Sequence, residues 1–503
     1  MKQIFTFLST LTFALGFSQD GFLDTTYGNS GFYVHNSGAY GKSIEIDANQ
    51  KMVIGSYGTD RTFKFFRFSS SNQLDTTFGT GGSTSISLGG ENAVLNDMKI
   101  QPDGKIVAVG YWEDAGSANR KDFIVVRLNA DGTLDTTFNA TGKLTIAFGT
   151  NEDVANAVAI QNDGKILVAG HSFTGSFRDI AIARINVDGT FDNTFGTNGK
   201  ITTDIAGNHD AATCIAINSD GKFAVGSYTY GAGSSNNFAD FGVAKYNTNG
   251  SLDTSFSTDG KHVVVIAPSF NDKPVAIAFQ SNGKILMGGS ALLSTSTRDD
   301  FAVVRLNANG TLDTSFNTAG IFTTALGSSD DTAYAMKLLS DGKILLAGTI
   351  SSGSYNDIGL IRVTSSGYLD TTFGTNGKTQ QGYGNLSVIQ DMDVMSDGKI
   401  MVCGSAGTTN IFLARFNGST PLSLGTNDLV ADKKEFSLYP NPVKDVLYSD
   451  QKLENFELYS ASGSLIKSGK NEKSISVHDL PKGVYMLKIK NKDKSITKKI
   501  IKN

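Results

Sequence analysis

Oxygen-bearing side chains recur in a short motif that has the chemistry of a calcium loop. In the run from Asn129 to Asp135 they stand at alternate positions around the turn residue Gly132. Other copies hold fewer carboxylates; one reads Thr364-Ser365-Ser366-Gly367. We therefore expect no cofactor, with calcium left open, and a structural Asp that accepts backbone N–H bonds before a Phe that fills the gap between repeats.

The motif is a variant of Leu-Asp-Thr-Thr-Phe-Gly, and it occurs seven times. Successive copies are 51, 60, 57, 61, 60 and 57 residues apart, which is the signature of a repeat architecture. A residue that returns in every repeat is structural by default. The seven motif aspartates are Asp24, Asp75, Asp135, Asp192, Asp253, Asp313 and Asp370.

One basic residue also recurs in the third predicted strand of each repeat. Several of them follow an Asp by five residues, and at an odd separation two side chains of one strand point to opposite faces. We therefore expect no pairing within the strand, and a structural role with partners in adjacent repeats. The set is Arg67, Arg127, Arg184, Lys245, Arg305, Arg362 and Arg415.

Residues that vary between repeats are the candidates for function. Aromatic side chains in the predicted loops after the second strands suit stacking on sugar rings or anchoring of a protein, although local packing explains them equally well. Acidic residues precede the first strands, and they predict either a ring at a channel mouth or simple turn caps. The aromatic set is Tyr111, Trp112, His171, Phe173, Tyr228 and Tyr230. The acidic set is Glu91, Glu152, Asp153, Asp210, Asp272, Asp330 and Asp331.

Catalytic signatures are absent from the sequence. The five His residues have no metal-ligand spacing, and neither a Gly-x-Ser-x-Gly elbow nor a Cys/His arrangement occurs. We expect a binding protein more than an enzyme, with no catalytic residue and no metal assigned. The alternative is a polysaccharide-degrading enzyme, which would need two carboxylates at the channel mouth, such as Asp153 and Asp331.

Each repeat has the pattern of a four-stranded antiparallel meander. Residues 154–160 form an apolar run, Asp163-Gly164 marks a tight hairpin turn, and 166–169 return. A third strand covers 179–185 and a fourth 200–205. Abundant Gly, 56 residues against 7 Pro, agrees with an all-β protein that has many turns.

The ends of the repeat array are out of phase, and this predicts a closed ring. The chain opens with a motif and a fourth-type strand near residues 32–35, and the last repeat lacks both. Closure removes exposed sheet edges. We predict an all-β chain with a seven-bladed β-propeller over 19–418, closed by the N-terminal strand; an open β-solenoid is the alternative.

The motifs resemble the delta-60 repeat family of bacterial surface and secreted proteins. The resemblance rests on the Asp-Gly-Lys-Ile strand, on the Arg-Leu-Asn-x-Asp-Gly-x-Leu-Asp-Thr-Thr-Phe-Gly run and on the period near sixty. It covers all seven units and implies a propeller-like fold with no defined enzymatic activity.

The remaining segments predict an exported protein. Residues 1–18 read as a signal peptide, with a basic start and an apolar stretch too short to span a membrane. The net charge of −4 gives no reason to expect nucleic acid as a partner. Cys214 and Cys403 fall in non-adjacent repeats, so we expect no disulfide. No transmembrane segment is expected, and we expect a monomer.

The tail from residue 432 has a composition of its own. It holds 15 Lys and no Arg, and its turn spacing predicts a small β-sandwich over 432–503 after a linker at 419–431. It resembles the type A sorting domain of the type IX secretion system; a basic carbohydrate-binding or adhesive module is the alternative. The matching residues are Tyr439, Pro440, Asn441, Pro442, Gly483 and Tyr485.

The resemblance of the tail implies the secretion machinery as a partner, and a place outside the cell or on the outer surface of a Gram-negative bacterium. We therefore expect a secreted or cell-surface propeller that acts as a binding or adhesion module for polysaccharide or another surface molecule. A structural adhesin that binds no soluble glycan is a further alternative. The ligand itself is not identified by any motif.

Overall fold

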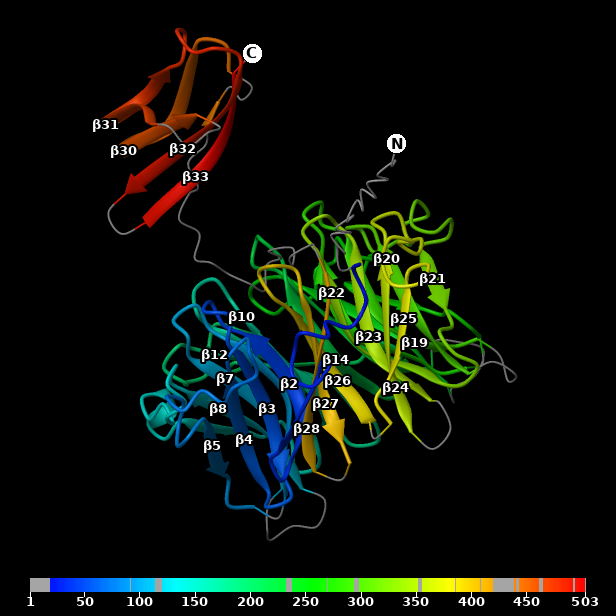
Figure 1. Cartoon of the computed structure of the whole chain (residues 1–503). Helices are drawn as coiled ribbons and strands as arrows, with labels where there is room; N and C mark the ends of the chain where they lie inside the picture. The colour runs from blue at the N-terminus through cyan, green and yellow to red at the C-terminus, as the bar shows by residue number, and fades with distance from the viewer. Residues whose placement is uncertain are drawn as a thin grey trace, which may run out of the picture. The chain divides into compact units, whose positions relative to one another are not determined.

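The computed structural model describes most of the chain. The described residues are 19–90, 92–113, 120–231, 238–268, 270–293, 298–351, 355–384, 386–407, 409–418, 438–439, 443–460, 465–491 and 494–502. The predicted signal peptide, Glu91 and the Pro440-Asn441-Pro442 run lie outside them. The chain divides into two compact units, residues 1–430 and 431–503 (Figure 1).

In its described residues the first unit is built from seven four-stranded antiparallel sheets. Sheet 1 consists of β2 (Ala39–Ile46), β3 (Met52–Gly58), β4 (Thr62–Phe68) and β5 (Ser83–Ser87). Sheet 2 consists of β6 (Asn92–Ile100), β7 (Ile106–Glu113), β8 (Lys121–Leu128) and β9 (Lys143–Ile146). Sheet 3 consists of β10 (Asp153–Ile160), β11 (Ile166–Phe173), β12 (Arg178–Ile185) and β13 (Lys200–Thr203). Sheet 4 consists of β14 (Asp210–Ile217), β15 (Phe223–Tyr230), β16 (Ala239–Tyr246) and β17 (Lys261–Val264). Sheet 5 consists of β18 (Asp272–Phe279), β19 (Ile285–Leu292), β20 (Asp299–Leu306) and β21 (Ile321–Thr324). Sheet 6 is β22 (Asp331–Leu338), β23 (Ile344–Ser351), β24 (Asn356–Val363), β25 (Lys378–Gly382). A single 3-10 turn, η1 (Phe138–Ala140), interrupts this pattern within the described residues.

Sheet 7 joins the two ends of the repeat array. It runs in the order β1 (Phe32–Asn36), β28 (Asn410–Phe416), β27 (Ile400–Ala406), β26 (Leu386–Val394). The N-terminal strand β1 pairs antiparallel with β28, with Phe32 opposite Ala414 and Asn36 opposite Asn410. The first strand of each sheet contacts the first strand of the next, and β2 contacts both β26 and β27. The sheets therefore follow one another in a closed cycle.

Local sequence explains each sheet. The Asp-Gly turns supply the positive φ that tight hairpins need, as at Gly164 with φ +82°. The apolar second strand is buried along nearly its whole length, as in β11. Each described first strand contains a β-bulge; in β10 the register shifts between Ala155 and Ala157. The bulge leaves one extra side chain, Asn156, free to reach the neighbouring sheet.

The core of the first unit lies between successive sheets. The motif aromatics Phe78, Phe138, Phe195, Phe256 and Phe316 are all fully buried there. Cys214 and Cys403 are buried free thiols. Within the described residues, no helix has the length and hydrophobicity to cross a membrane.

The second unit is a five-stranded sheet in its described part. Its core includes Leu447, Phe456, Leu458 and Leu487. Tyr439 pairs with Tyr448, Gly483 opens β32, and the buried Tyr485 donates its hydroxyl to the Pro481 carbonyl at 2.8 Å. The predicted sandwich remains a prediction. The strands are β29 (Leu438–Tyr439), β30 (Val446–Ser460), β31 (Leu465–Ser476), β32 (Gly483–Asn491) and β33 (Lys494–Lys502).

Candidate functional site: the central cavity

The motif Asp of each repeat is the centre of a buried hydrogen-bond network. Asp135 Oδ1 accepts the backbone N–H (3.1 Å) and the hydroxyl (2.6 Å) of Thr137. Its Oδ2 accepts Arg127 Nε at 2.7 Å and Lys105 Nζ at 3.0 Å. The same four donors, or their Ser and Lys equivalents, surround the other six motif aspartates.

The same network also joins neighbouring sheets. Arg127 Nη1 donates to the Val187 carbonyl in the following sheet at 2.5 Å, and its guanidinium lies 4.5 Å from the centre of the Phe138 ring. Phe138 packs against Gly189, where a Cβ would come within 2.9 Å of the ring. The recurring basic residue therefore pairs with the motif Asp of its own repeat, a partner that sequence reasoning missed, and it binds the next repeat through its other nitrogens.

Four of the predicted mouth acids are fully buried. Asp153 Oδ2 accepts Phe148 N at 2.6 Å, and Asp331 Oδ2 accepts Leu326 N at 2.6 Å. Asp210 and Asp272 accept equivalent N–H groups. All four side chains are 0% exposed. They cap the loops between sheets and do not line an open mouth, so the charged-ring hypothesis is wrong for them, as is their use as exposed catalytic carboxylates.

The two remaining described acids of that set are in different surroundings. Glu152 is partly exposed and bonds Lys121 Nζ (2.9 Å), Arg178 Nε (3.0 Å) and His171 Nε2 (3.2 Å). The pKa of Glu152 lies far below its usual value, chiefly because His171 forms a hydrogen bond with its carboxylate. Burial opposes this effect, and Lys121 and Arg178 lower the pKa further. Asp330 lies 3.5 Å from Arg298 Nη1.

The predicted aromatic loop residues lie in strands. Tyr111 and Trp112 end β7, His171 and Phe173 end β11, and Tyr228 and Tyr230 end β15. None of the six is among the exposed large hydrophobic side chains of the described residues. Their assignment to exposed loops is therefore wrong, because the second strands extend further than the Gly signals indicate. His171 and Tyr228 nevertheless line the central cavity.

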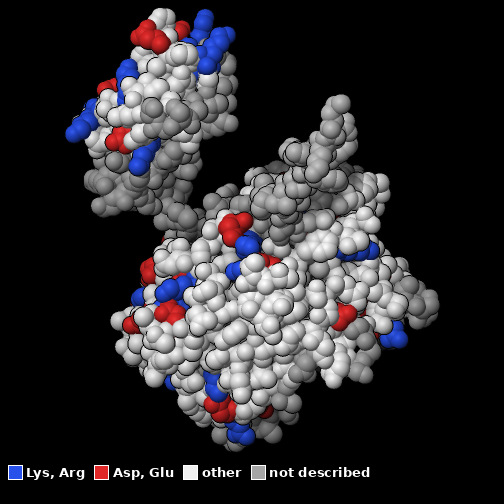
Figure 2. Space-filling view, in the orientation of Figure 1, with Lys and Arg blue, Asp and Glu red and all other residues white. Residues whose placement is uncertain are grey.

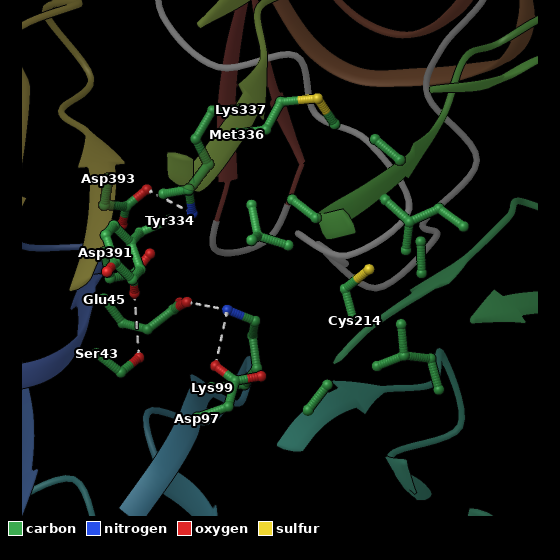
Figure 3. A pocket seen from close by; sticks show the side chains of 18 of the residues that line it. Ser43, Glu45, Asp97, Lys99, Cys214, Tyr334, Met336, Lys337, Asp391 and Asp393 are labelled. Atoms are coloured by element: carbon green, nitrogen blue, oxygen red, sulfur yellow. Dashed lines mark hydrogen bonds and ion pairs between the residues drawn. The ribbon is translucent and has the colours of Figure 1, made fainter. Parts of the chain in front are cut away.

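The central cavity has a volume of about 1280 Å³ and is lined by the first strands of the seven sheets. Its wall is charged on the side of sheets 6, 7, 1 and 2, where Glu45, Asp97, Lys99 and Lys337 stand beside Asp391 and Asp393 (Figure 3). On the side of sheets 3 to 5 the lining includes Ala157, Val158, Ile215, Ala216, Ile277 and Phe279. In contrast, Figure 2 shows acidic and basic side chains mixed over the visible surface.

Ion pairs and backbone N–H groups hold the charged wall in place. Lys99 Nζ contacts Glu45 Oε1 and lies 4.0 Å from Asp97 Oδ1, and Lys337 Nζ lies 3.2 Å from Asp393 Oδ1. Asp391 Oδ2 accepts Ile44 N at 2.9 Å from the neighbouring sheet. Because the inner edge of each sheet is unpaired, its N–H groups are available to these carboxylates.

The charged wall perturbs the titration of its own groups. Burial raises the pKa of Glu45 to about 7, although Lys99 and Lys337 oppose the shift. Burial lowers the pKa of Lys99, but Glu45, Asp97 and Asp391 raise it more, so the net pKa is well above the usual value. Lys99 therefore stays charged.

One sequence signal could have identified this wall. The residue six positions before the Lys of each first turn is Ala159, Ala216 and Ala278 in three repeats. In the other four, which are consecutive around the ring, it is Lys337, Asp393, Glu45 and Lys99. A charged residue at a strand position that is Ala in the other repeats therefore identifies the charged wall of the cavity.

Comparisons with known proteins agree with this architecture. Residues 101–138, 161–195, 218–256, 280–316 and 339–373 match the family model described as domain of unknown function (DUF5122) beta-propeller. These are β-propeller repeats. Residues 437–503 match the secretion system C-terminal sorting domain. The protein is therefore secreted or held on the outer surface of a Gram-negative bacterium, and the delta-60 name stays a prediction.

Solved structures match the chain at low sequence identity. The extracellular domain of the hybrid two-component system BT4673 from B. thetaiotaomicron is 11% identical with a TM-score of 0.41; the match covers 97% of this chain, which spans 59% of that one. Polysaccharide lyase Uly1 is 12% identical to this chain, with a TM-score of 0.42. That match covers 79% of this chain and 97% of the lyase chain. The β-propeller domain of the Trilobed protease from Pyrococcus furiosus is 11% identical to this chain, with a TM-score of 0.39. That match covers 80% of this chain and 98% of the protease domain. No curated protein matches the chain.

Buried acids at the junctions between sheets predict an unusual pH dependence. Burial raises the pKa of Asp240 to about 6 and that of Asp272, which faces Asp240, to about 7. Because the folded-state pKa of each acid lies above its unfolded value of 3.8, the protonated acid stabilises the fold at low pH. This stability is fully present below pH 3.8 and is lost as the pH rises through 6 to 7.

We therefore expect the free energy of unfolding, measured by urea denaturation, to fall as the pH rises from about 4 to 7, by about 1.4 kcal/mol for each pH unit that separates the unfolded and folded pKa of an acid. Asp240→Asn should flatten this dependence. Asp259→Asn, which alters an exposed acid of the same repeat, should leave it unchanged. A profile that rises over this range, or that Asp240→Asn does not alter, would contradict the assignment.

Proposed function

We propose that the protein is an extracellular binding module whose seven sheets are the seven blades of a closed β-propeller and whose ligand enters the central cavity. In this proposal residues 1–18 are the signal peptide, 19–418 the propeller, 419–431 a linker and 432–503 the sorting domain, folded as a β-sandwich and engaged by the type IX secretion machinery. The ligand is a polysaccharide or another cell-surface molecule, and the module acts in binding or adhesion.

The departure of the cavity wall from the repeat supports this proposal. A structural position would be filled alike in all repeats, as the motif Asp is. At the position of Ala216 and Ala278, four consecutive repeats instead place Lys337, Asp393 and their two neighbours in the cavity wall. Buried charges are costly to desolvate and are weak contributors to stability. Their retention on one side of a cavity is most simply explained by recognition of a ligand.

The wall also limits the chemistry of the ligand. Ammonium groups of Lys99 and Lys337 can donate to hydroxyl or carboxylate oxygens, and Asp97 and Asp391 can accept from hydroxyl groups. The apolar side, with Ile215 and Ile277, can cover the less polar face of a ring. A sugar ring with its hydroxyl groups presents both kinds of surface. A polysaccharide segment is therefore the ligand class that the cavity fits best.

A glycan-array screen of the full secreted chain tests the proposal. We expect selective retention of some glycans, and Lys337→Met should weaken the binding of the best one by about tenfold, equivalent to about 1.4 kcal/mol. Arg298→Met is the matched control: it removes an exposed cation of the same unit, 63% exposed, and should leave the affinity unchanged.

Each other outcome has a distinct meaning. A blank array would contradict the polysaccharide ligand and favour a protein partner or an adhesin. Unchanged affinity in Lys337→Met would place the ligand outside the cavity. Release of shortened glycans from the array would support the enzymatic alternative.

A further inference from the structure

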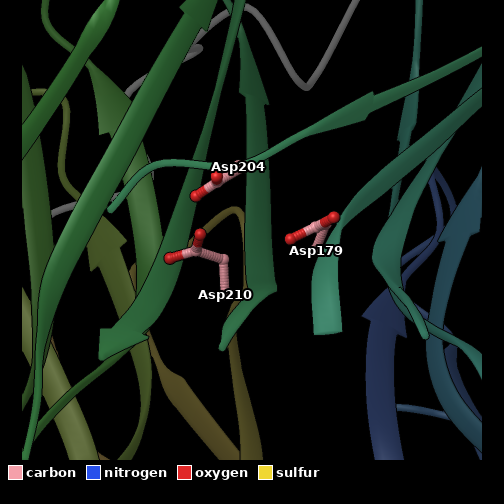
Figure 4. Close-up of side chains that lie close together, drawn as sticks. All are labelled: Asp179, Asp204 and Asp210. Atoms are coloured by element: carbon pink, nitrogen blue, oxygen red, sulfur yellow. The ribbon is translucent and has the colours of Figure 1, made fainter. Parts of the chain in front are cut away.

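Three carboxylates meet at the junction between sheets 3 and 4. Asp179 lies in β12, Asp204 follows β13, and Asp210 opens β14 (Figure 4). One oxygen from each lies within 4.8 Å of those of the other two. Two oxygens that bind one Ca²⁺ at 2.3–2.6 Å are at most about 5 Å apart, so this spacing fits ligands of a single ion.

Asp204 distinguishes this junction from the equivalent ones. The residue after it, Ile205, donates its N–H to Asp210, as Phe148 does to Asp153. Aligned on that hydrogen bond, the residues equivalent to Asp204 are Ala147, Val265 and Ala325. Among these four junctions, only this one therefore carries a carboxylate at that position.

Asp210, one member of the cluster, has a buried oxygen without a partner. The side chain is 0% exposed, and its Oδ1 has no hydrogen-bond partner within the described structure, as is also true of Oδ1 in the equivalent Asp153, Asp272 and Asp331. Oδ2 is occupied by the Ile205 N–H at 2.7 Å. The nearby Thr229 hydroxyl is hydrogen-bonded with Ser227 at 2.9 Å. A buried carboxylate oxygen without a donor is costly, and a bound cation would remove that cost.

Asp179 and Asp204 each use one oxygen locally. Asp179 Oδ2 accepts the Thr174 hydroxyl, and Asp204 Oδ1 accepts Gly207 N at 2.5 Å. Lys261 lies close by, but its ammonium donates to the main-chain carbonyl of Asp204 at 3.1 Å and pairs with Asp259 at 3.8 Å. In the described residues no Lys or Arg pairs with the three carboxylates. Asp204 is exposed, so an ion can enter from solvent.

We propose that Asp179, Asp204 and Asp210 form a site for one divalent cation, with Ca²⁺ as the ion that the all-oxygen donor set and the extracellular location favour. The ion would tie strand β12 to the start of β14 across two successive sheets. Waters would complete the shell beyond the three carboxylates. Extracellular sites of this kind bind Ca²⁺ with dissociation constants of about 10⁻⁴–10⁻³ M.

Calorimetric titration of the full chain with CaCl₂ after EDTA treatment and dialysis tests the site. We expect one Ca²⁺ per chain, and an increase in melting temperature on its addition. Asp204→Ala should weaken binding at least about tenfold and abolish the increase, because one of three charged ligands is lost. The variant should fold normally, since two equivalent junctions carry Ala at this position.

Asp330→Ala is the matched control, because it removes another acid from a loop between sheets without touching the cluster. It should bind Ca²⁺ as the wild type does. Equal binding by Asp204→Ala and the wild type would overturn the proposal. The absence of Ca²⁺ binding to the wild type at 5 mM CaCl₂ would also overturn it, because this concentration is about five times the weakest dissociation constant expected for such sites. Neither result depends on whether a glycan occupies the central cavity.

Discussion

Asp135→Ala is expected to lower the free energy of unfolding by about 3–5 kcal/mol, because it leaves a buried guanidinium without its counter-charge. The Arg127 side chain is only 3% exposed and that of Asp135 only 2%. Burial opposes ionisation of Asp135, but the hydrogen bonds from Thr137, Lys105 and Arg127 outweigh it and hold its pKa well below the usual value. Urea denaturation followed by far-ultraviolet circular dichroism measures the loss.

Asp131→Ala provides the control for this prediction. Asp131 is exposed in the same repeat, and its carboxylate accepts only from Thr133, at 2.9 and 2.7 Å. We expect a loss of about 1 kcal/mol or less, as for an exposed turn hydrogen bond. Equal losses in the two variants would show that the network around Asp135 contributes nothing beyond the turn.

The repeat made much of the fold predictable from the sequence. The Asp-Gly turns and apolar runs give a four-stranded unit, and the phase of the ends places residues 32–35 beside the last repeat, where β1 pairs with β28. Strand ends were less predictable. The second strands continue through Tyr111 and Tyr228, because backbone pairing with the third strand persists beyond the Gly at which the sequence signal stops.

The candidate site was less predictable than the fold, since burial depends on the packing of distant repeats. Asp153 and Asp331 precede the strands that the sequence predicts, and this favours exposure, but the preceding loops fold back and donate N–H groups to both. Glu45 and Lys99 are 54 residues apart, and only the packing of sheet 1 against sheet 2 brings them into contact. Comparison of one position across repeats would have found the charged wall, but not its ion pairs.

Deletion of residues 19–36 is expected to lower the melting temperature by about 10 °C or more. It removes β1, so β28 becomes an exposed edge. It also removes Asp24, whose Oδ2 accepts Arg415 Nε at 2.9 Å and also contacts Lys399. Phe32, whose ring centre lies 5.0 Å from that of Tyr383, is lost from the core as well. Calorimetric melting and gel filtration measure the loss of stability and any edge-to-edge association.

Truncation of the second unit, residues 431–503, is the matched control. That unit is compact by itself, so its removal should leave the main melting transition in place. The comparison also separates the two architectures that the sequence left open. In an open solenoid each repeat contacts only its neighbours, and loss of a terminal strand costs one local interface. In a closed ring the same deletion opens the contact of β2 with β26 and β27, so the cooperativity of the whole unit should fall together with its melting temperature.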